Sequence, residues 1–113
     1  MDSASARELV LAIDGVVEHD HFGRGAYRVA SANGKPSRIF MTLWIEMHRA
    51  VLMLTPDQQR ELHERDPEIF FPVPNKWGEN GATFVELSKV NEKQFRSALE
   101  IAMGNAASKP RKA

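Results

Sequence analysis

The chain of 113 residues contains no cysteine, which excludes disulfide bonds, thiolate metal sites and cysteine nucleophiles. The absence suits a reducing cytosol, so we expect a cytoplasmic protein. Long apolar runs are also missing, because the apolar stretches are short and interrupted by Arg or Glu. We therefore expect no membrane-spanning segment. The N-terminal MDSASARE has an early acidic residue and no apolar core, which is unlike a signal peptide.

An excess of either charge is lacking too, since 15 basic residues face 15 acidic ones. A strong non-specific nucleic-acid binder usually carries a basic excess, because phosphate contacts supply most of its affinity. The charge is nevertheless uneven along the chain. Residues 1–20 carry one basic and five acidic residues, whereas residues 22–49 carry five basic residues and one acid. The last nine residues add three basic residues, so positive charge is concentrated in one central segment and the C-terminal tail.

Length and a hydrophobic fraction of 42% predict one globular domain with a core of its own. Apolar periodicity predicts the following elements: helices over 3–13, 56–65 and 91–103; strands over 16–18, 27–30, 38–45, 49–54 and 82–87; a polar connection over 19–25, a packed apolar segment over 69–74 and a loop over 75–81. This order indicates an α+β fold with an antiparallel, curved sheet of about five strands. We expect the domain to span residues 1–104 and a disordered basic tail to span 105–113.

Three local signals support this arrangement. Asn33-Gly34 is a strong turn signal, which predicts a hairpin whose loop projects as a wing. Thr55-Pro56-Asp57-Gln58 contains an N-cap, a proline at the first helical position and a capping box. In Ile39–Ile45 both alternating sets of residues are largely apolar, as in a central strand covered on both faces. Helices can cover one of these faces. The other face would be covered by curvature of the sheet, by a partner bound in a groove or by a second copy of the chain.

Several short motifs carry a family resemblance. They are Phe22-Gly23, Tyr27-Arg28-Val29, Ile39-Phe40-Met41-Thr42-Leu43, Leu54-Thr55-Pro56, Asp66-Pro67, Pro72-Val73-Pro74 and Lys76-Trp77-Gly78. With these motifs the chain resembles the MmcQ/YjbR-like family of small bacterial α+β domains, from roughly residue 9 to residue 103. The resemblance implies a fold similar to a phage double-wing transcription factor, and a non-enzymatic DNA-binding function.

The basic residues of the central segment then become candidate DNA contacts. We expect Lys35, Arg38 and Lys76 to hold phosphates, and Arg28 and Arg49 to line a sheet face. The alternative is that these arginines, with Arg24, are surface charges that pair with Glu18, Glu46 and Glu86 across strands.

Trp77 is the candidate for stacking on a base. The alternative, which loop tryptophans of small domains favour, is that Trp77 closes one end of the core beside Pro72 and Pro74.

Catalytic and metal chemistry find no matching pattern. No nucleophile elbow or phosphate-binding loop is present, and the acids around residues 57–68 have the spacing of a solvated helix face. His19 and His21 share one side of a strand but lack a third ligand, so we expect no metal and no cofactor.

Two rival functions stay open. A protein-interaction or chaperone-like module could use the second apolar face of Ile39–Ile45 to bind a partner or form a homodimer, and Phe70–Pro74 favours it. A small-molecule sensor could use a pocket near Trp44 and Trp77.

Overall fold

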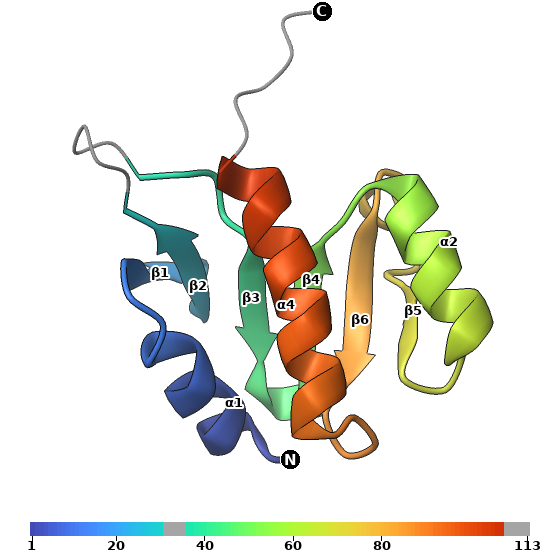
Figure 1. Ribbon diagram of the computed structural model, residues 1–113, viewed down its shortest axis with the longest axis horizontal. Coiled ribbons are helices and arrows are strands. Elements are labelled where there is room, and N and C mark those ends of the chain that lie inside the picture. Colours follow the sequence, from blue (N-terminus) through green and yellow to red (C-terminus); the bar gives the residue numbers. More distant parts are fainter. Residues whose placement is uncertain (31–35, 108–113) are drawn as a thin grey trace, which may run out of the picture.

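Six antiparallel strands form one sheet in the order β1-β2-β3-β4-β6-β5, and helices α1 and α4 lie against one of its faces (Figure 1). The computed structural model describes residues 1–30 and 36–107. The elements are α1 (Ser3–Leu11), β1 (Val16–His21), β2 (Arg24–Val29), β3 (Met41–Trp44), the 3-10 helix η1 (Ile45–Met47), β4 (Arg49–Met53), α2 (Pro56–Arg65), β5 (Phe70–Pro72), α3 (Lys76–Glu79), β6 (Ala82–Glu86) and α4 (Glu92–Ala107). The expected α+β class is confirmed, with six strands rather than about five.

Local capping explains where two of the helices begin. The hydroxyl of Thr55 accepts from Gln58 N at 3.1 Å, and the Gln58 side chain accepts from Thr55 N at 2.9 Å, so the predicted capping box is confirmed. Asn91 and Gln94 make the same reciprocal pair at the start of α4. Helix α1 is capped by Asp2, whose side chain accepts from Ser5 N, and it ends at Leu11, before the expected end at residue 13.

The expected polar connection over residues 19–25 is wrong, because this segment forms a β-hairpin. Strand β1 continues to His21 and pairs with β2 from Arg24 onward. Phe22 and Gly23 have φ values of 54° and 85°, as a two-residue turn between strands requires. Edge strand β1 leaves much of its length exposed, so its polar side chains resembled those of a loop.

Two further elements differ from expectation near the C-terminal half of the sheet. Residues 70–72 form edge strand β5, which pairs with β6 and was expected only as a packed segment. Residues 76–79 form α3 where a loop was expected, and Asn75 caps this helix by accepting from Gly78 N at 3.1 Å. Both elements were too short for periodicity to reveal.

The C-terminal helix is longer than the sequence predicted. Helix α4 continues through Gly104 to Ala107 and so includes residues 105–107, which were expected in the tail. The expected Asn33-Gly34 turn, Lys35 and residues 108–113 lie outside the described residues.

The principal core lies between the sheet and helices α1 and α4. Fully buried Tyr27, Phe40, Leu52 and Val85 of this core belong to the same cluster as Phe95 of α4. Phe40 directly precedes β3 and packs into the same cluster as Met41, so the expected alternation of Ile39–Ile45 is wrong at this position. No helix in the described part of the chain combines the length and the apolar character needed to cross a membrane.

Candidate functional site

The second face of the sheet, opposite α1 and α4, holds the candidate site and is called the open face below. Strand register defines it, because Ala26, Thr42, Val51, Phe84 and Phe71 lie opposite one another across five strands. Side chains two positions away along each strand share the same face. The open face therefore also carries Arg24 and Arg28 of β2, Trp44 of β3, Arg49 of β4 and Glu86 of β6.

Guanidinium groups lie over aromatic rings on the open face. The Cζ atom of Arg24 is 3.8 Å from the centroid of the Trp44 ring. That of Arg49 is 5.0 Å from the centroids of both Phe71 and Phe84. The Trp44 and Phe84 rings meet edge to face with centroids 5.2 Å apart. These contacts join strands β2, β3, β4, β5 and β6 into one continuous surface of planar groups.

Two glutamates neutralise part of this positive charge. Arg24 pairs with Glu46 of η1, and Arg49 Nε lies 2.9 Å from Glu86 Oε1. Burial alone would raise the pKa of Glu86, but hydrogen bonds from Arg49 and Ser88 outweigh it and hold that pKa below its ordinary value. The pKa of Glu46 is lowered by a backbone hydrogen bond and by Arg24. Both carboxylates are therefore charged at neutral pH. The ion pairs of Arg24 with Glu46 and of Arg49 with Glu86 agree with the alternative in which these arginines are paired surface charges.

The other glutamate in that alternative, Glu18, has a different partner. It accepts two hydrogen bonds at 2.8 Å from Arg7 of α1 and one at 2.6 Å from the Tyr27 hydroxyl. The bonds from Arg7 and Tyr27 lower the pKa of Glu18 to about 2. This cluster fixes α1 to the hairpin on the helix side of the sheet, away from the open face.

The structure brings together only part of the predicted nucleic-acid set. Arg28 and Arg49 share the open face but lie toward opposite ends of their strands. Arg38 is separate from that face, because its guanidinium donates to the Asn105 carbonyl at 3.1 Å. Lys76 and Trp77 are exposed on α3, and Lys35 lies outside the described residues.

Trp77 does not close the core, so that interpretation is wrong. Trp77 retains 36% of its accessible surface and belongs to neither buried core cluster. The buried member of Lys76-Trp77-Gly78 is the glycine, where an added Cβ would lie 1.7 Å from the Val73 carbonyl oxygen. Glycine is therefore required at position 78, because α3 packs directly on the Val73 backbone.

Arg28 connects the open face to the histidines of β1. Its Nε donates to His19 Nε2 at 2.8 Å and its Nη1 donates to the Ser37 carbonyl at 3.1 Å. The second histidine, His21, packs edge to face on Phe22 with centroids 4.7 Å apart. Within residues 1–30 and 36–107, no group of three His, Cys, Asp or Glu side chains is placed to hold a metal ion.

The predicted nucleic-acid set omitted Trp44, Phe71 and Arg24, which share the open face. Alternation in β3 placed Trp44 on the second face, which was a usable signal. No comparable sequence signal marked Phe71, because its position beside Phe84 follows from the pairing of β5 with β6, which local sequence patterns do not specify. Comparisons with protein-family models, with curated proteins and with solved structures found no match to this chain.

Proposed function

We propose that this chain is a non-enzymatic, cytoplasmic nucleic-acid-binding protein of the MmcQ/YjbR-like type, and that it binds through the open face. The family assignment rests on the motifs quoted above, including Lys76-Trp77-Gly78 and Pro72-Val73-Pro74. The placement on the open face rests on the structure's combination of arginines and rings. Arg38 and Lys76 lie off that face and become secondary phosphate contacts in this proposal.

The observation that carries the proposal is the pair of guanidinium–aromatic stacks, Arg24 on Trp44 and Arg49 on Phe71 and Phe84. Nucleobases stack on aromatic rings and on guanidinium planes, and base–aromatic stacking is worth about 1–3 kcal/mol per base. A duplex hides the faces of its bases. The open face therefore suits a single strand better than a duplex.

Donor capacity at the stacks is incompletely used. Arg24 Nε is buried and has no hydrogen-bond partner among the described residues, although Arg24 pairs with Glu46 through Nη2. An unpaired buried donor in a native fold calls for an explanation. Because Arg24 Nε is buried, a phosphate or a base oxygen would satisfy it only after the Arg24 side chain moves on Trp44.

Charge limits the affinity that this face can supply. Arg24, Arg28 and Arg49 face Glu46 and Glu86, which leaves a net charge of one on the open face. A slope of about −0.7 per neutralised phosphate applies to single strands, so log K should fall by roughly 0.7 per decade of salt for the open face alone and by about 2 with Arg38 and Lys76 added. We expect micromolar binding that is weaker and less sensitive to salt than that of a strongly basic protein.

Fluorescence anisotropy with labelled single-stranded and duplex DNA at two salt concentrations tests the proposal. We expect saturable binding that is tighter for the single strand and weaker at the higher salt concentration. An absence of binding to either DNA at low salt would remove nucleic acid as the ligand of the open face.

A specific observation favours a protein partner as the second candidate. A groove of about 440 Å³ is lined by Trp44, Met47 and the segment Phe71–Asn75, and Ile45 beside it is 61% exposed. Apolar and proline-bearing walls of this kind accept extended peptides or a second sheet. A concentration-dependent increase in mass by analytical ultracentrifugation, abolished by Ile45→Asp, would support a homodimer over nucleic acid.

A further inference from the structure

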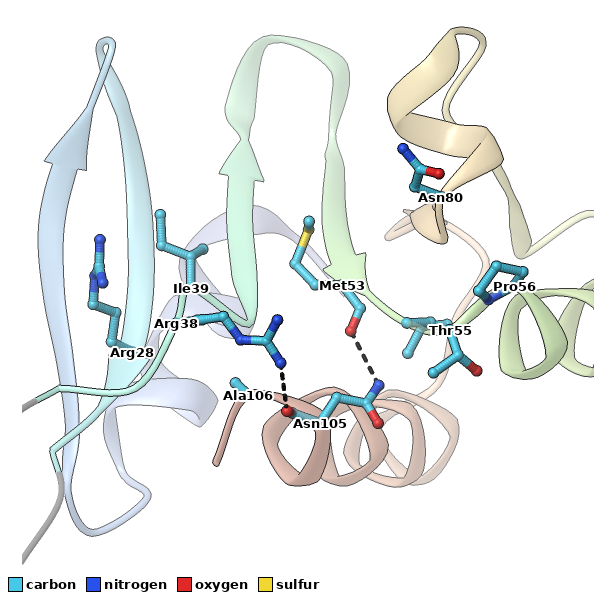
Figure 2. A pocket seen from close by; sticks show the side chains of 10 residues that line it. Arg28, Arg38, Ile39, Met53, Thr55, Pro56, Asn80, Asn105 and Ala106 are labelled. Atoms are coloured by element: carbon cyan, nitrogen blue, oxygen red, sulfur yellow. Dashed lines mark hydrogen bonds between the residues drawn. The ribbon is translucent and has the colours of Figure 1, made fainter. Parts of the chain in front are cut away.

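A cavity of about 520 Å³ lies at the end of the sheet where β4 leads into α2, separate from the stacked rings (Figure 2). Figure 2 shows Arg28 and Arg38 on the β2 side of the cavity, Thr55, Pro56 and Asn80 on the opposite side, and Asn105 of α4 below Met53. Its volume is within the range of about 300–1,000 Å³ that small-molecule sites occupy.

The cavity gathers the arginines that have no carboxylate partner. Eight arginines occur within residues 1–30 and 36–107, and six of them form ion pairs within 4.0 Å: Arg7, Arg24, Arg49, Arg60, Arg65 and Arg96. The remaining two, Arg28 and Arg38, both line this cavity. The described lining includes no Asp or Glu, so nothing there neutralises their charge.

Neutral hydrogen bonds use only part of each guanidinium. Arg38 donates through Nη2 to the Asn105 carbonyl at 3.1 Å. Arg28 donates through Nε to His19 and through Nη1 to the Ser37 carbonyl. An arginine has five N–H donors in a planar fork that matches carboxylate and phosphate oxygens. Counting partners within residues 1–30 and 36–107, donors therefore remain on both side chains for a bound anion.

The remaining walls combine apolar surface with amides. Ile39, Met53 and Leu54 supply apolar side chains, and the exposed Asn80 supplies an amide. Thr55 and Pro56 form the N-terminus of α2, whose dipole favours negative charge nearby. Asn105 is fixed in place, because its Nδ2 donates to the Met53 carbonyl at 3.3 Å and to Gln58 Oε1 at 2.7 Å. This side of the cavity is thus held before any ligand arrives.

We propose that this cavity binds a small organic anion, with a carboxylate or phosphate headgroup on Arg38 and Arg28 and an apolar body against Ile39, Met53 and Leu54. The ligand class follows from two uncompensated cations beside an apolar wall. Arg28 also lies on the open face and Arg38 is a secondary phosphate contact in the proposed function. The test below uses small anions and no nucleic acid, so its outcome does not depend on DNA binding.

Arg38 also has a structural role, which the test must separate from ligand binding. Its bond to the Asn105 carbonyl satisfies an acceptor in the last turns of α4, where a cation opposes the helix dipole. Loss of stability alone in an Arg38 variant therefore supports only that role. Loss of anion binding by a folded variant supports the site.

The experiment titrates hexanoate, phenyl phosphate and the neutral hexan-1-ol into the ¹⁵N-labelled protein and follows backbone amide shifts. We expect at least one anion to give saturable shifts at residues such as Ile39, Leu54 and Ala106, and hexan-1-ol to bind far more weakly. Arg38→Gln should weaken the anion by about tenfold or more, because it removes a charge-assisted bond. Arg96→Gln, whose ion pair with Glu92 lies on the exposed side of α4, is the matched control and should leave binding unchanged.

Two results would overturn the proposal. One is the absence of saturable shifts at the cavity with both anions on the wild-type protein, a result that does not depend on any variant folding. The other is equal binding of hexanoate and hexan-1-ol, which would reduce the cavity to a non-specific apolar depression.

Discussion

The pair Arg49 and Glu86 gives the sharpest test of nucleic-acid binding, because two substitutions break one ion pair and change the charge of the open face in opposite directions. Their side chains are 28% and 17% exposed, so breaking this partly accessible pair should cost up to about 1 kcal/mol of stability. Arg49→Gln also loses its contacts with the rings of Phe71 and Phe84, worth about 0.5–1 kcal/mol. Both variants should therefore remain folded.

Their effects on binding should have opposite signs. Glu86→Gln raises the net charge of the open face, whereas Arg49→Gln lowers it to zero. One charge near a phosphate at the surface is worth about 1 kcal/mol, which is about fivefold in affinity. We expect single-stranded DNA to bind about fivefold tighter to Glu86→Gln and at least fivefold weaker to Arg49→Gln. The salt slope should change by about 0.7 in each direction.

Anisotropy titrations of both variants at two salt concentrations, with thermal denaturation as a check on folding, measure these quantities. If both substitutions weaken binding equally, the pair acts only by shaping the sheet. If neither changes binding, DNA contacts another surface, and the reasoning from the open face is refuted.

Two further predictions concern stability. Gly78→Ala should destabilise the fold by about 1–3 kcal/mol, because its Cβ would lie 1.7 Å from the Val73 carbonyl oxygen. Gly104→Ala should stabilise α4 by up to about 1 kcal/mol, because beyond its chain neighbours and the local helix backbone no described atom lies within 4 Å of the added Cβ. Chemical denaturation of both variants measures these two changes. Because the folded pKa of Glu18 is lowered from 4.5 to about 2, its stabilising effect should be complete above pH 4.5 and lost as the pH falls toward 2. Urea denaturation across this range should show about 1 kcal/mol less pH dependence in Glu18→Gln, a magnitude reduced for the exposure of Glu18 and Arg7. A pH profile identical to that of the wild type would show that Glu18 does not stabilise the fold.

The sequence by itself determined the local parts of this protein. The Thr55 capping box and the helix that apolar periodicity predicted from residue 91 onward were both confirmed. Each depends on residues three to four positions apart, whose contacts follow from helix geometry alone. The α+β class followed from the order of such elements.

Turns and short elements were only partly predictable from the sequence. The Phe22-Gly23 turn was visible as a motif, but its role as a hairpin turn required knowing that β1 pairs with β2. Helix α3 is four residues long, too short for an apolar period to appear. Exposure of Trp77 likewise depends on the packing of α3, and residue type alone predicted the opposite.

Only the tertiary structure decided which side chains share a surface. Strand β6 enters between β4 and β5, which places Glu86 opposite Arg49 and Phe71 opposite Phe84. Periodicity assigns a residue to a face of its own strand, but it contains no information about which strand lies beside it. Arg28 and Arg38 meet at one cavity for the same reason, because the β2 and β3 ends must first be placed against α4. The candidate sites arise from contacts between elements distant in sequence, which local patterns cannot specify.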